Sequence, residues 1–384
     1  MELVYLDNNA TTMVSPEVTA AMLPYFGELY ANPSSMYAFG GKAASAMEVA
    51  REQVANLIGA DPSEILFTSS GSESDNTAFW SALQSSPEKK HIVTTRVEHP
   101  AVLNVCKYWE RKGYQVTYLG VDRKGDLDLE EYKRSLQDNI ALVSIMYANN
   151  EVGNIYPIKE LAEIAKERDI LFHTDAVQAV GKIPIDLKNV PVDMLSLSGH
   201  KIHAPKGIGV LYIRKGTKFR SFIRGGHQEH GRRAGTENVP YIVGLGVASQ
   251  LSQEFMDYEQ HTVANLRNQL EKEILQKVPD CLVNGDIEHR TPNTTNISFR
   301  NVEGEAILLM LDRYGIAASS GSACTSGSLE PSHVLRAMGV PFNYAHGSIR
   351  FSLSRYTTSE EIQYVVEKVP GIIETLRKIS PFKN

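Results

Sequence analysis

Short apolar runs alternate with helical patterns between residue 65 and residue 213. The runs occupy residues 65–67, 91–93, 141–145, 170–172 and 194–197. Strands that alternate with helices in this way are typical of a mostly parallel sheet wrapped by helices. The pattern therefore predicts an α/β fold for this part of the chain.

The pattern changes in the second half of the chain. Residues 238–277 read as one long helical stretch, which we expect to bridge two domains. Beyond it we expect strands near Leu282, over 295–298 and over 348–353, together with a helix over 303–314 and a last helix. This tail predicts a second, smaller α/β domain.

Length and charge narrow the possible functions. At 384 residues, 42% of them hydrophobic, the chain is long enough for two packed domains. The net charge of -6, with basic residues scattered along the chain, gives no electrostatic reason to expect a nucleic acid partner. No run approaches the roughly 20 apolar residues of a membrane span, and the N-terminus is acidic where a signal peptide is basic. We therefore expect a cytoplasmic protein that acts on small molecules or proteins, with no membrane partner.

Three cysteines lie far apart and show no CxxC spacing, so we expect neither a disulfide framework nor a metal site. Cys106 and Cys281 have apolar neighbours, as core cysteines do. Cys324 lies in residues 317–328, which are almost all small. That composition predicts a mobile loop with an accessible thiol.

Polar residues follow several predicted strands directly, and in an open α/β sheet ligands bind at the carboxyl ends of the strands. Gly71 and Ser72 follow the first strand at the start of a helix, where free N–H groups and the helix dipole suit a phosphate. A simple helix cap is the alternative interpretation. His99 follows the next strand and precedes Pro100, which favours a helix start. A lone histidine there is more often structural.

Two further junctions carry amides and an acid. Asn150 follows the strand at 141–145, Asp175 ends a nearly pure apolar strand, and Gln178 comes three residues later at a helical spacing. An acid buried there needs a partner. A salt bridge or a helix cap is one interpretation, and an acid that holds a protonated pyridine nitrogen is the other.

The most informative junction holds Lys201, which lies between two buried-strand patterns. Most lysines are solvated surface residues, but this context is typical of a lysine that forms a Schiff base, for which pyridoxal phosphate supplies the electron sink. In the last predicted strand, Arg350 is a candidate for binding an amino-acid carboxylate with two hydrogen bonds. A solvent-facing arginine is the alternative, and Arg355 is a nearby competitor.

Taken together and in this order, these segments resemble the cysteine desulfurases of the class V aminotransferase family, of the type that feeds iron–sulfur cluster assembly. The likeness rests on residues 5–12, 32–35, 68–72, 98–99, 149–151, 198–201, 232–238, 320–324 and 348–352. It implies the type I fold of pyridoxal-phosphate-dependent transferases, with a mostly parallel mixed sheet wrapped by helices in a large domain and a smaller C-terminal α/β domain. The expected large domain is 15–257, and the small one combines 1–14 with 258–384.

The resemblance also implies roles for individual residues. Lys201 would form the Schiff base with pyridoxal phosphate, Asp175 would pair with the pyridine nitrogen, and His99 would stack on the ring. Gln178 and Asn150 would contact the edge that carries the phenolic oxygen. The phosphate would be held by Gly71, Ser72, Ser198, His200 and, from a second subunit, Thr236. That last contact implies a homodimer.

The implied reaction removes sulfur from L-cysteine. Arg350 and Asn150 would bind the substrate, Lys201 would take the proton from Cα, and the Cys324 thiolate would attack the substrate sulfur with His99 as acid/base. The products would be L-alanine and a Cys324 persulfide, which would donate sulfur to an acceptor protein such as an iron–sulfur scaffold or to other pathways. The alternatives are a selenocysteine lyase, an aminotransferase of the same fold and a non-catalytic sulfur carrier. A cysteine on a small-residue loop favours the desulfurase over the aminotransferase.

Overall fold

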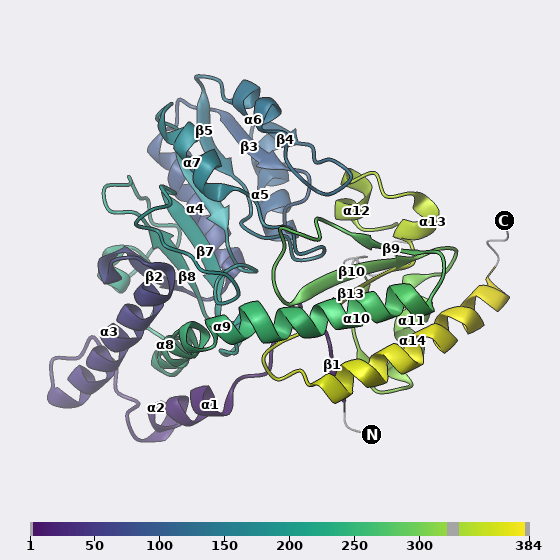
Figure 1. Ribbon diagram of the computed structural model, residues 1–384. Helices are drawn as coiled ribbons and strands as arrows, with labels where there is room; N and C mark the ends of the chain where they lie inside the picture. Colours follow the sequence, from purple (N-terminus) through teal and green to yellow (C-terminus); the bar gives the residue numbers. More distant parts are fainter. Residues whose placement is uncertain (1–2, 321–329, 381–384) are drawn as a thin grey trace.

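A seven-stranded sheet forms the larger part of the molecule in the computed structural model, which describes residues 3–320 and 330–380 (Figure 1). Its strands lie in the order β2 (Ile65–Thr68), β8 (Gly209–Ile213), β7 (Met194–Ser198), β6 (Phe172–Asp175), β5 (Ile140–Ser144), β3 (His91–Thr95) and β4 (Gln115–Leu119). Only β8 runs against its neighbours, β2 and β7, whereas the other pairs are parallel. The predicted mostly parallel sheet is confirmed.

Helices cover both faces of this sheet. One hydrophobic cluster joins it to α3 (Ala38–Ile58), α7 (Ile158–Lys166) and α8 (Val239–Glu254). A second cluster, on the opposite face, joins it to α4 (Gly71–Ser85) and α5 (Pro100–Glu110). The inner strands are therefore buried on both sides, which explains why they read as continuous apolar runs, whereas the edge strand β4 is only partly buried.

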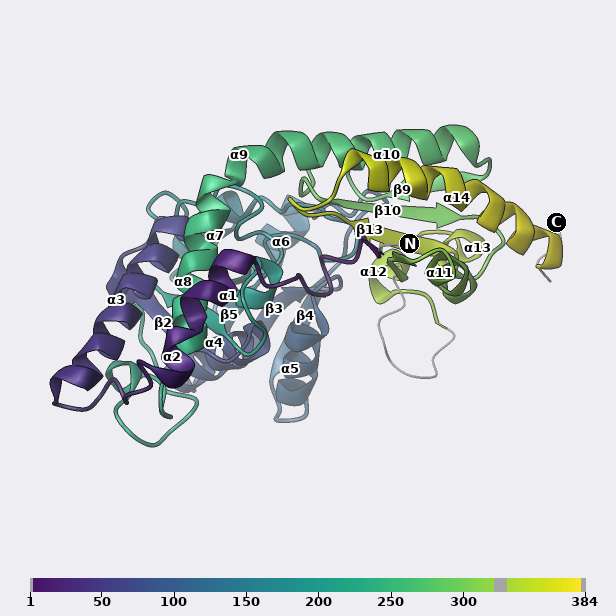
Figure 2. The same cartoon turned by 90° about the horizontal axis from the view of Figure 1, so that it is seen from below.

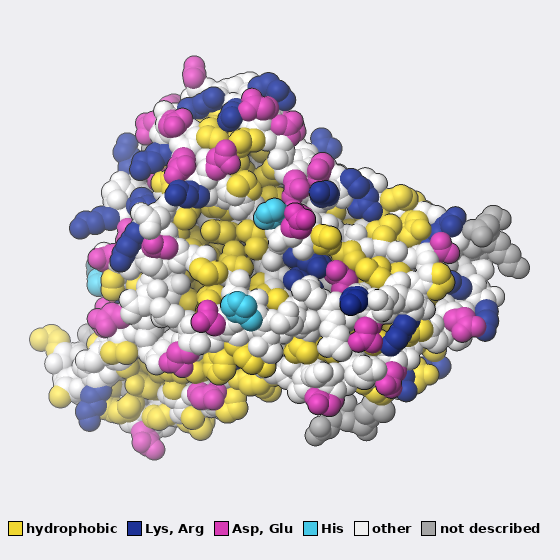
Figure 3. Space-filling view, in the orientation of Figure 1, with side chains coloured by type: hydrophobic (Ala, Val, Ile, Leu, Met, Phe, Trp, Pro, Cys, Tyr) yellow, Lys and Arg dark blue, Asp and Glu magenta, His cyan; other side chains and the backbone are white. Residues whose placement is uncertain are grey.

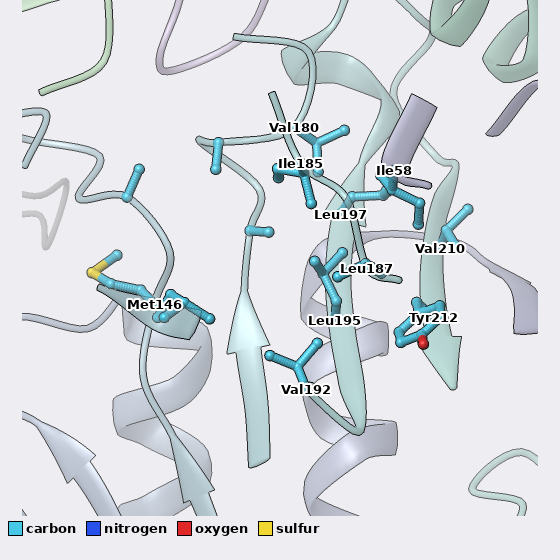
Figure 4. Close-up of a cluster of buried hydrophobic side chains, with 14 of the residues drawn as sticks. Ile58, Met146, Val180, Ile185, Leu187, Val192, Leu195, Leu197, Val210 and Tyr212 are labelled. Carbon is cyan, nitrogen blue, oxygen red and sulfur yellow. The ribbon is translucent and has the colours of Figure 1, made fainter. Parts of the chain in front are cut away.

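Strand β7 shows how side chains divide between the two faces. Leu195 and Leu197 point into the first cluster, beside Val210 and Tyr212 of β8 (Figure 4). Because successive side chains of a strand alternate, Ser196 and Ser198 face the side on which α4 lies. The alternation thus places hydroxyl groups on the α4 face at the carboxyl end of a buried strand.

A second, four-stranded sheet lies beside the first. Its antiparallel strands follow the order β12 (Ser319–Ser320), β13 (Ser348–Ser352), β10 (Thr294–Phe299) and β9 (Cys281–Asn284). Helices α10 (Ala264–Lys277) and α14 (Ser359–Ile379) lie side by side over it (Figure 2). The expected α/β tail is thus built on an antiparallel sheet, and an isolated parallel bridge between Ser352 and Asp7 joins this sheet to the N-terminal segment.

The N-terminal segment belongs to this second half of the molecule. Strand β1 (Val4–Tyr5) pairs in parallel with β11 (Ile316–Ala317), and Val4 and Leu6 join the hydrophobic cluster beneath α10 and α14. Helix α12 (His333–Ala337), by contrast, packs into the cluster of the first sheet. The expected domain boundaries remain a prediction.

The long helical stretch is interrupted where the sequence pattern gave no sign of it. It consists of α8, α9 (Met256–Tyr258), a π-helical turn at η4 (Glu259–Val263) and α10. The remaining elements are short and connect or flank these: α1 (Pro16–Met22), α2 (Pro24–Gly27), α6 (Leu129–Ser135), α11 (Gly304–Asp312), α13 (Phe342–Ala345), η1 (Pro62–Glu64), η2 (Gly199–Lys201) and η3 (Glu229–Gly231).

The surface carries mixed charges, and the two cysteines in the described residues differ in burial. Acidic and basic side chains are interspersed on the face shown in Figure 3, and none of the helices in the described ranges is long and apolar enough to cross a membrane. Cys106 is buried as predicted, but Cys281 is only half-buried because β9 is an edge strand.

A buried ion pair ties α3 to the first sheet. Arg51 donates two hydrogen bonds to Glu229, at 2.8 and 3.0 Å, and both side chains are only 3% exposed. Arg51 also donates to the carbonyl of Ile65, while Glu229 accepts from the backbone N–H of Phe67. The hydrogen-bonding atoms of the pair therefore find partners in β2, in each other and, for Arg51 Nε, in Glu48, as buried charges require.

Glu229→Ala should lower the free energy of unfolding by about 3–5 kcal/mol, because it leaves the buried Arg51 charge without its partner. Glu48 offers a matched control, since its carboxylate lies 3.3 Å from the same guanidinium but is 58% exposed. Glu48→Ala should cost less than about 1 kcal/mol. Urea unfolding at one protein concentration compares the two, and equal losses would contradict a decisive role for burial.

Candidate active site

A cavity of about 420 Å³ opens at the carboxyl ends of the parallel strands, where the second sheet approaches the first. Ten of the twelve residues that the sequence singled out line it: Gly71, Ser72, His99, Asn150, Asp175, Gln178, Ser198, His200, Lys201 and Arg350. Of the first nine, Asp175 and Ser198 end strands of the large sheet and the other seven follow such strands, whereas Arg350 comes from β13. Segments far apart in the sequence thus meet around one space.

Two predicted residues are not part of this wall. Thr236 is exposed between η3 and α8 and does not line the cavity, so its expected role in a second subunit stays a prediction. Cys324 lies in residues 321–329, outside the described residues. Ser319 and Ser320, which precede that segment, do line the cavity.

The amine of Lys201 is held by the N-terminal segment. Strand β7 ends at Ser198, and the short helical turn η2 then places Lys201 at the cavity. Its Nζ donates to the backbone carbonyls of Asn9 (2.6 Å) and Ala10 (2.7 Å). Burial lowers the pKa of Lys201 to about 8, with Arg350 adding to this effect. The amine therefore exchanges its proton readily near neutral pH.

Asp175 ends β6 and is buried at the cavity wall. Its Oδ1 accepts a hydrogen bond from the backbone N–H of Val177 (2.9 Å). Burial raises the pKa of Asp175, while His99 and Lys201 oppose that shift by favouring the carboxylate. A cation placed in the cavity against this acid would stabilise its charged form further.

A buried polar network, which the sequence analysis missed, lies next to Asp175. Asp75, on α4, also lines the cavity, and its Oδ1 lies 3.6 Å from His173 Nε2 without a hydrogen bond from any described residue. His173 in turn meets the hydroxyls of Ser144 and Ser196, each at 2.9 Å. Burial, and then the nearby Asp175 charge, raise the pKa of Asp75 well above its usual range. Asp75 could have been predicted to lie near the cavity, because it follows Gly71 by one turn of the same helix.

His99 caps the N-terminus of α5. Its Nδ1 accepts a hydrogen bond from the backbone N–H of Ala101 (3.1 Å), which fits a neutral imidazole. The side chain is open to the cavity, yet surrounding protein desolvates it and lowers its pKa, an effect that Asp175 opposes. His99 is therefore a neutral ring facing the cavity at neutral pH.

The start of α4 offers an anion site. Gly71 and Ser72 are its first residues, and Ser70 Oγ accepts from the N–H of Glu73, which leaves the earliest N–H groups for a ligand. A side chain at Gly71 would not fit, because its Cβ would lie 2.8 Å from Val177 Cγ2. A side chain at residue 71 would thus require Val177 to shift, which the sequence analysis did not foresee.

Two polar residues from neighbouring turns complete this side of the cavity. Ser198 is buried at the end of β7, and His200 meets Thr11 Oγ1 through its Nδ1 at 3.2 Å. Burial lowers the pKa of His200 to about 4. At neutral pH His200 can therefore donate only one ring hydrogen and carries no charge.

Arg350 projects from β13 with part of its guanidinium already engaged. Nη1 donates to the carbonyl of Asn150 (3.0 Å) and Nη2 donates to Asp7 Oδ1 (2.7 Å), while Nε has no partner among the described residues. A guanidinium has five N–H donors. Arg350 thus keeps donors for an incoming carboxylate, and Asp7 fixes its position.

Asn9 was quoted only as part of a motif, but it organises the cavity floor. Its side-chain Nδ2 donates to Thr294 Oγ1 (2.8 Å) and to the Asn150 carbonyl (3.1 Å). Its backbone carbonyl accepts from Gln178 Nε2 (3.0 Å) as well as from Lys201. One buried asparagine therefore links the first sheet to β10.

The cavity thus gathers an amine of lowered pKa, a buried acid, a neutral imidazole and a guanidinium around one space. An amine of this kind serves as a nucleophile toward a carbonyl or as a base. The arrangement suits amino-acid chemistry on an anionic cofactor.

Comparisons with known proteins identify the family. The class V aminotransferase family matches residues 4–365 of the chain. The chain is 62% identical, over its whole length and 96% of the relative, to a protein named cysteine desulfurase from Trichormus azollae. It is 59% identical to the cysteine desulfurase NifS of Azotobacter vinelandii, with 99% of this chain and 94% of that one covered. A solved structure of a NifS-like protein matches with a TM-score of 0.92 at 41% identity, covering 97% of this chain and 100% of that one.

The predicted family and the type I fold of pyridoxal-phosphate-dependent transferases are therefore confirmed. The chain belongs to the class V aminotransferase family, among its cysteine desulfurases of the NifS type.

Proposed function

We propose that this enzyme removes sulfur from L-cysteine at the cavity, using pyridoxal phosphate held by Lys201, and stores the sulfur as a persulfide on Cys324. The observation that carries the proposal is the lysine amine of lowered pKa, which faces the same space as Asp175 and Arg350. The full-length likeness to proteins named cysteine desulfurase supports the choice of substrate.

The residues present fit pyridoxal phosphate. Lys201 supplies an amine for the aldehyde, and the buried Asp175 supplies a carboxylate for a protonated ring nitrogen. The N–H groups at Gly71 and Ser72, in a cradle too narrow for a side chain at residue 71, suit the phosphate. Ser198 and His200 lie nearby, and Thr236 of the partner subunit would complete the phosphate site in a homodimer. When bound, this cofactor serves as a sink for the electrons left by proton removal.

Substrate binding falls to Arg350 and Asn150. The free donors of Arg350 bind the carboxylate of cysteine, and its bonds to Asp7 and to the Asn150 carbonyl keep the guanidinium in one orientation. His99, neutral and open to the cavity, would lie against the cofactor ring and could accept a proton from the substrate thiol. Each group is thus fixed before the substrate arrives.

Lys201 then moves the proton. Its neutral amine would take the proton from Cα of cysteine, as its lowered pKa allows near neutral pH. The Cys324 thiolate attacks the substrate sulfur, so that a sulfur–sulfur bond forms as the carbon–sulfur bond breaks. Protonation of the remaining three-carbon fragment gives L-alanine. An acceptor protein, such as an iron–sulfur scaffold, would receive the persulfide sulfur.

A selenocysteine lyase is the second candidate, because the same amine, acid and guanidinium would admit selenocysteine. Comparing rates on the two amino acids decides between them.

Lys201→Ala should abolish the release of alanine from L-cysteine, because no other described amine lines the cavity.

Cys324→Ala should still bind pyridoxal phosphate and cysteine. Its rate of sulfide release in the presence of a reductant should fall by about 100-fold or more, the scale of losing a catalytic group. Cys281→Ser is the matched control, since Cys281 is half-buried on β9, outside the cavity wall, and should keep parental activity. Parental sulfide release by Cys324→Ala would refute its role as acceptor.

The capture of pyridoxal phosphate by the cofactor-free protein should depend on pH through Lys201. Its pKa is lowered to about 8, so the reactive neutral amine is scarce below that pH and predominates above it. The capture rate should rise with pH and level off above about 8. Arg350→Gln removes a positive charge that lowers this pKa, and should therefore move the midpoint upward. A parental midpoint near the ordinary lysine value of about 10.4 would contradict the account.

A further inference from the structure

Lys182 is a second buried lysine, one layer behind the cavity wall. It follows Gln178 by four residues and is 6% exposed. Its Nζ donates to Gln178 Oε1 (2.5 Å) and to Asn9 Oδ1 (3.1 Å). Both acceptors belong to residues that line the cavity, whereas Lys182 itself does not line it.

The partners of Lys182 are unusual for a buried lysine. Such lysines normally pair with a carboxylate, yet the two acceptors here are neutral amides, and no ion pair of Lys182 occurs in the described part of the chain. The backbone carbonyl of Lys182 accepts from Gln260 Nε2, which fixes this turn against η4.

The chemistry of an amine determines how those amides point. An ammonium group can only donate hydrogen bonds, so Gln178 must turn its oxygen toward Lys182 and its Nε2 away. That Nε2 then donates to the Asn9 carbonyl, and its second hydrogen remains for the cavity. Asn9 is fixed in the same way, because Lys182 and Asn293 Nδ2 both donate to its Oδ1.

We propose that Lys182 is a positioning residue of the reaction, which orients the Gln178 amide so that an N–H faces the cofactor edge bearing the phenolic oxygen. This inference deepens the proposed function and rests on it. The same contact orients Asn9, whose carbonyl holds the Lys201 amine. One buried donor thereby aligns two groups that act on the cofactor.

The charge of Lys182 responds to its surroundings. Burial lowers its pKa to about 7, with Lys201 and Arg350 adding to this effect and Glu259 of η4 opposing it. His200 and His203 also face it, and burial keeps both neutral at neutral pH. A neutral amine still has two hydrogens to donate, so the amide orientation persists above the pKa of Lys182.

The test uses the cofactor-loaded enzyme and the pH at which its visible absorption band changes. Lys182→Met keeps the length and packing but removes the donor and the charge. Both losses favour the protonated form of the absorbing group, so the midpoint should move up by about 1 unit, the size expected for losing one nearby charge or hydrogen bond. Lys188→Met, at an exposed lysine of the same segment, should leave it unchanged.

A double-mutant cycle separates positioning from a merely structural role. In a Gln178→Met background there is no amide to orient, so most of the Lys182→Met shift should disappear. Lys182→Gln, which keeps a neutral donor, should shift the midpoint less than Lys182→Met. If Lys182→Met does not fold, Lys182→Gln takes its place in the double-mutant cycle with Gln178→Met. A parental midpoint in the Lys182 variants, or a shift that persists fully without Gln178, would overturn the proposal. Absence of any visible band in the parent enzyme would instead refute the proposed function.

Discussion

The side-chain amine of Lys201 lies below the protein surface, where an amine loses hydration and must find other acceptors. Those acceptors are two backbone carbonyls, of Asn9 and Ala10. No acidic side chain makes an ion pair with Lys201 among the residues that the structure describes, so burial lowers its pKa instead of a salt bridge raising it. The chemistry proposed for the cavity depends on these neutral acceptors, because a lysine in a salt bridge would remain protonated and unreactive.

The carbonyls that hold Lys201 belong to the N-terminal segment. Because the second sheet positions that segment, the site depends on the second sheet. Asn8 donates to the Ser352 carbonyl, and the Asn9 N–H donates to Ser352 Oγ, so β13 positions the N-terminal segment. The same strand carries Arg350, which donates a hydrogen bond to Asp7. The substrate-binding cation and the acceptors of the lysine amine are therefore placed by one strand, and a shift of β13 would disturb both.

The sequence allowed prediction of the parts of the site that follow strands of the parallel sheet. Lys201, Asp175 and His99 could be found because a polar residue directly after an apolar run lies at the ligand-binding edge of such a sheet. Asn9 and Lys182 could not, since their roles arise from contacts across about 170 residues of sequence that no local pattern records. The family resemblance pointed to the segment that contains Asn9 but not to its hydrogen bonds.

In the fold, too, some features could be predicted from the sequence and others could not. Burial on both faces made the inner strands of the large sheet visible as apolar runs, but not the partly exposed edge strand β4, and the antiparallel direction of β8 leaves no trace in such a run. The π-helical turn η4 was missed because the apolar spacing that predicted the helix, at Leu266, Leu270 and Ile274, lies wholly in α10, after the turn. Cys281 was misjudged because apolar neighbours do not reveal that β9 is an edge strand.

The central claim is that sulfur leaves cysteine and passes to Cys324 through chemistry that requires Lys201. The most direct measurement is the mass of the intact protein and of its Cys324 peptide after reaction of the loaded enzyme with isotopically labelled L-cysteine. The account predicts one added labelled sulfur on Cys324, removed by a reductant and absent from Lys201→Ala. Alanine formation with no labelled sulfur on Cys324, or labelling that survives in Lys201→Ala, would contradict it.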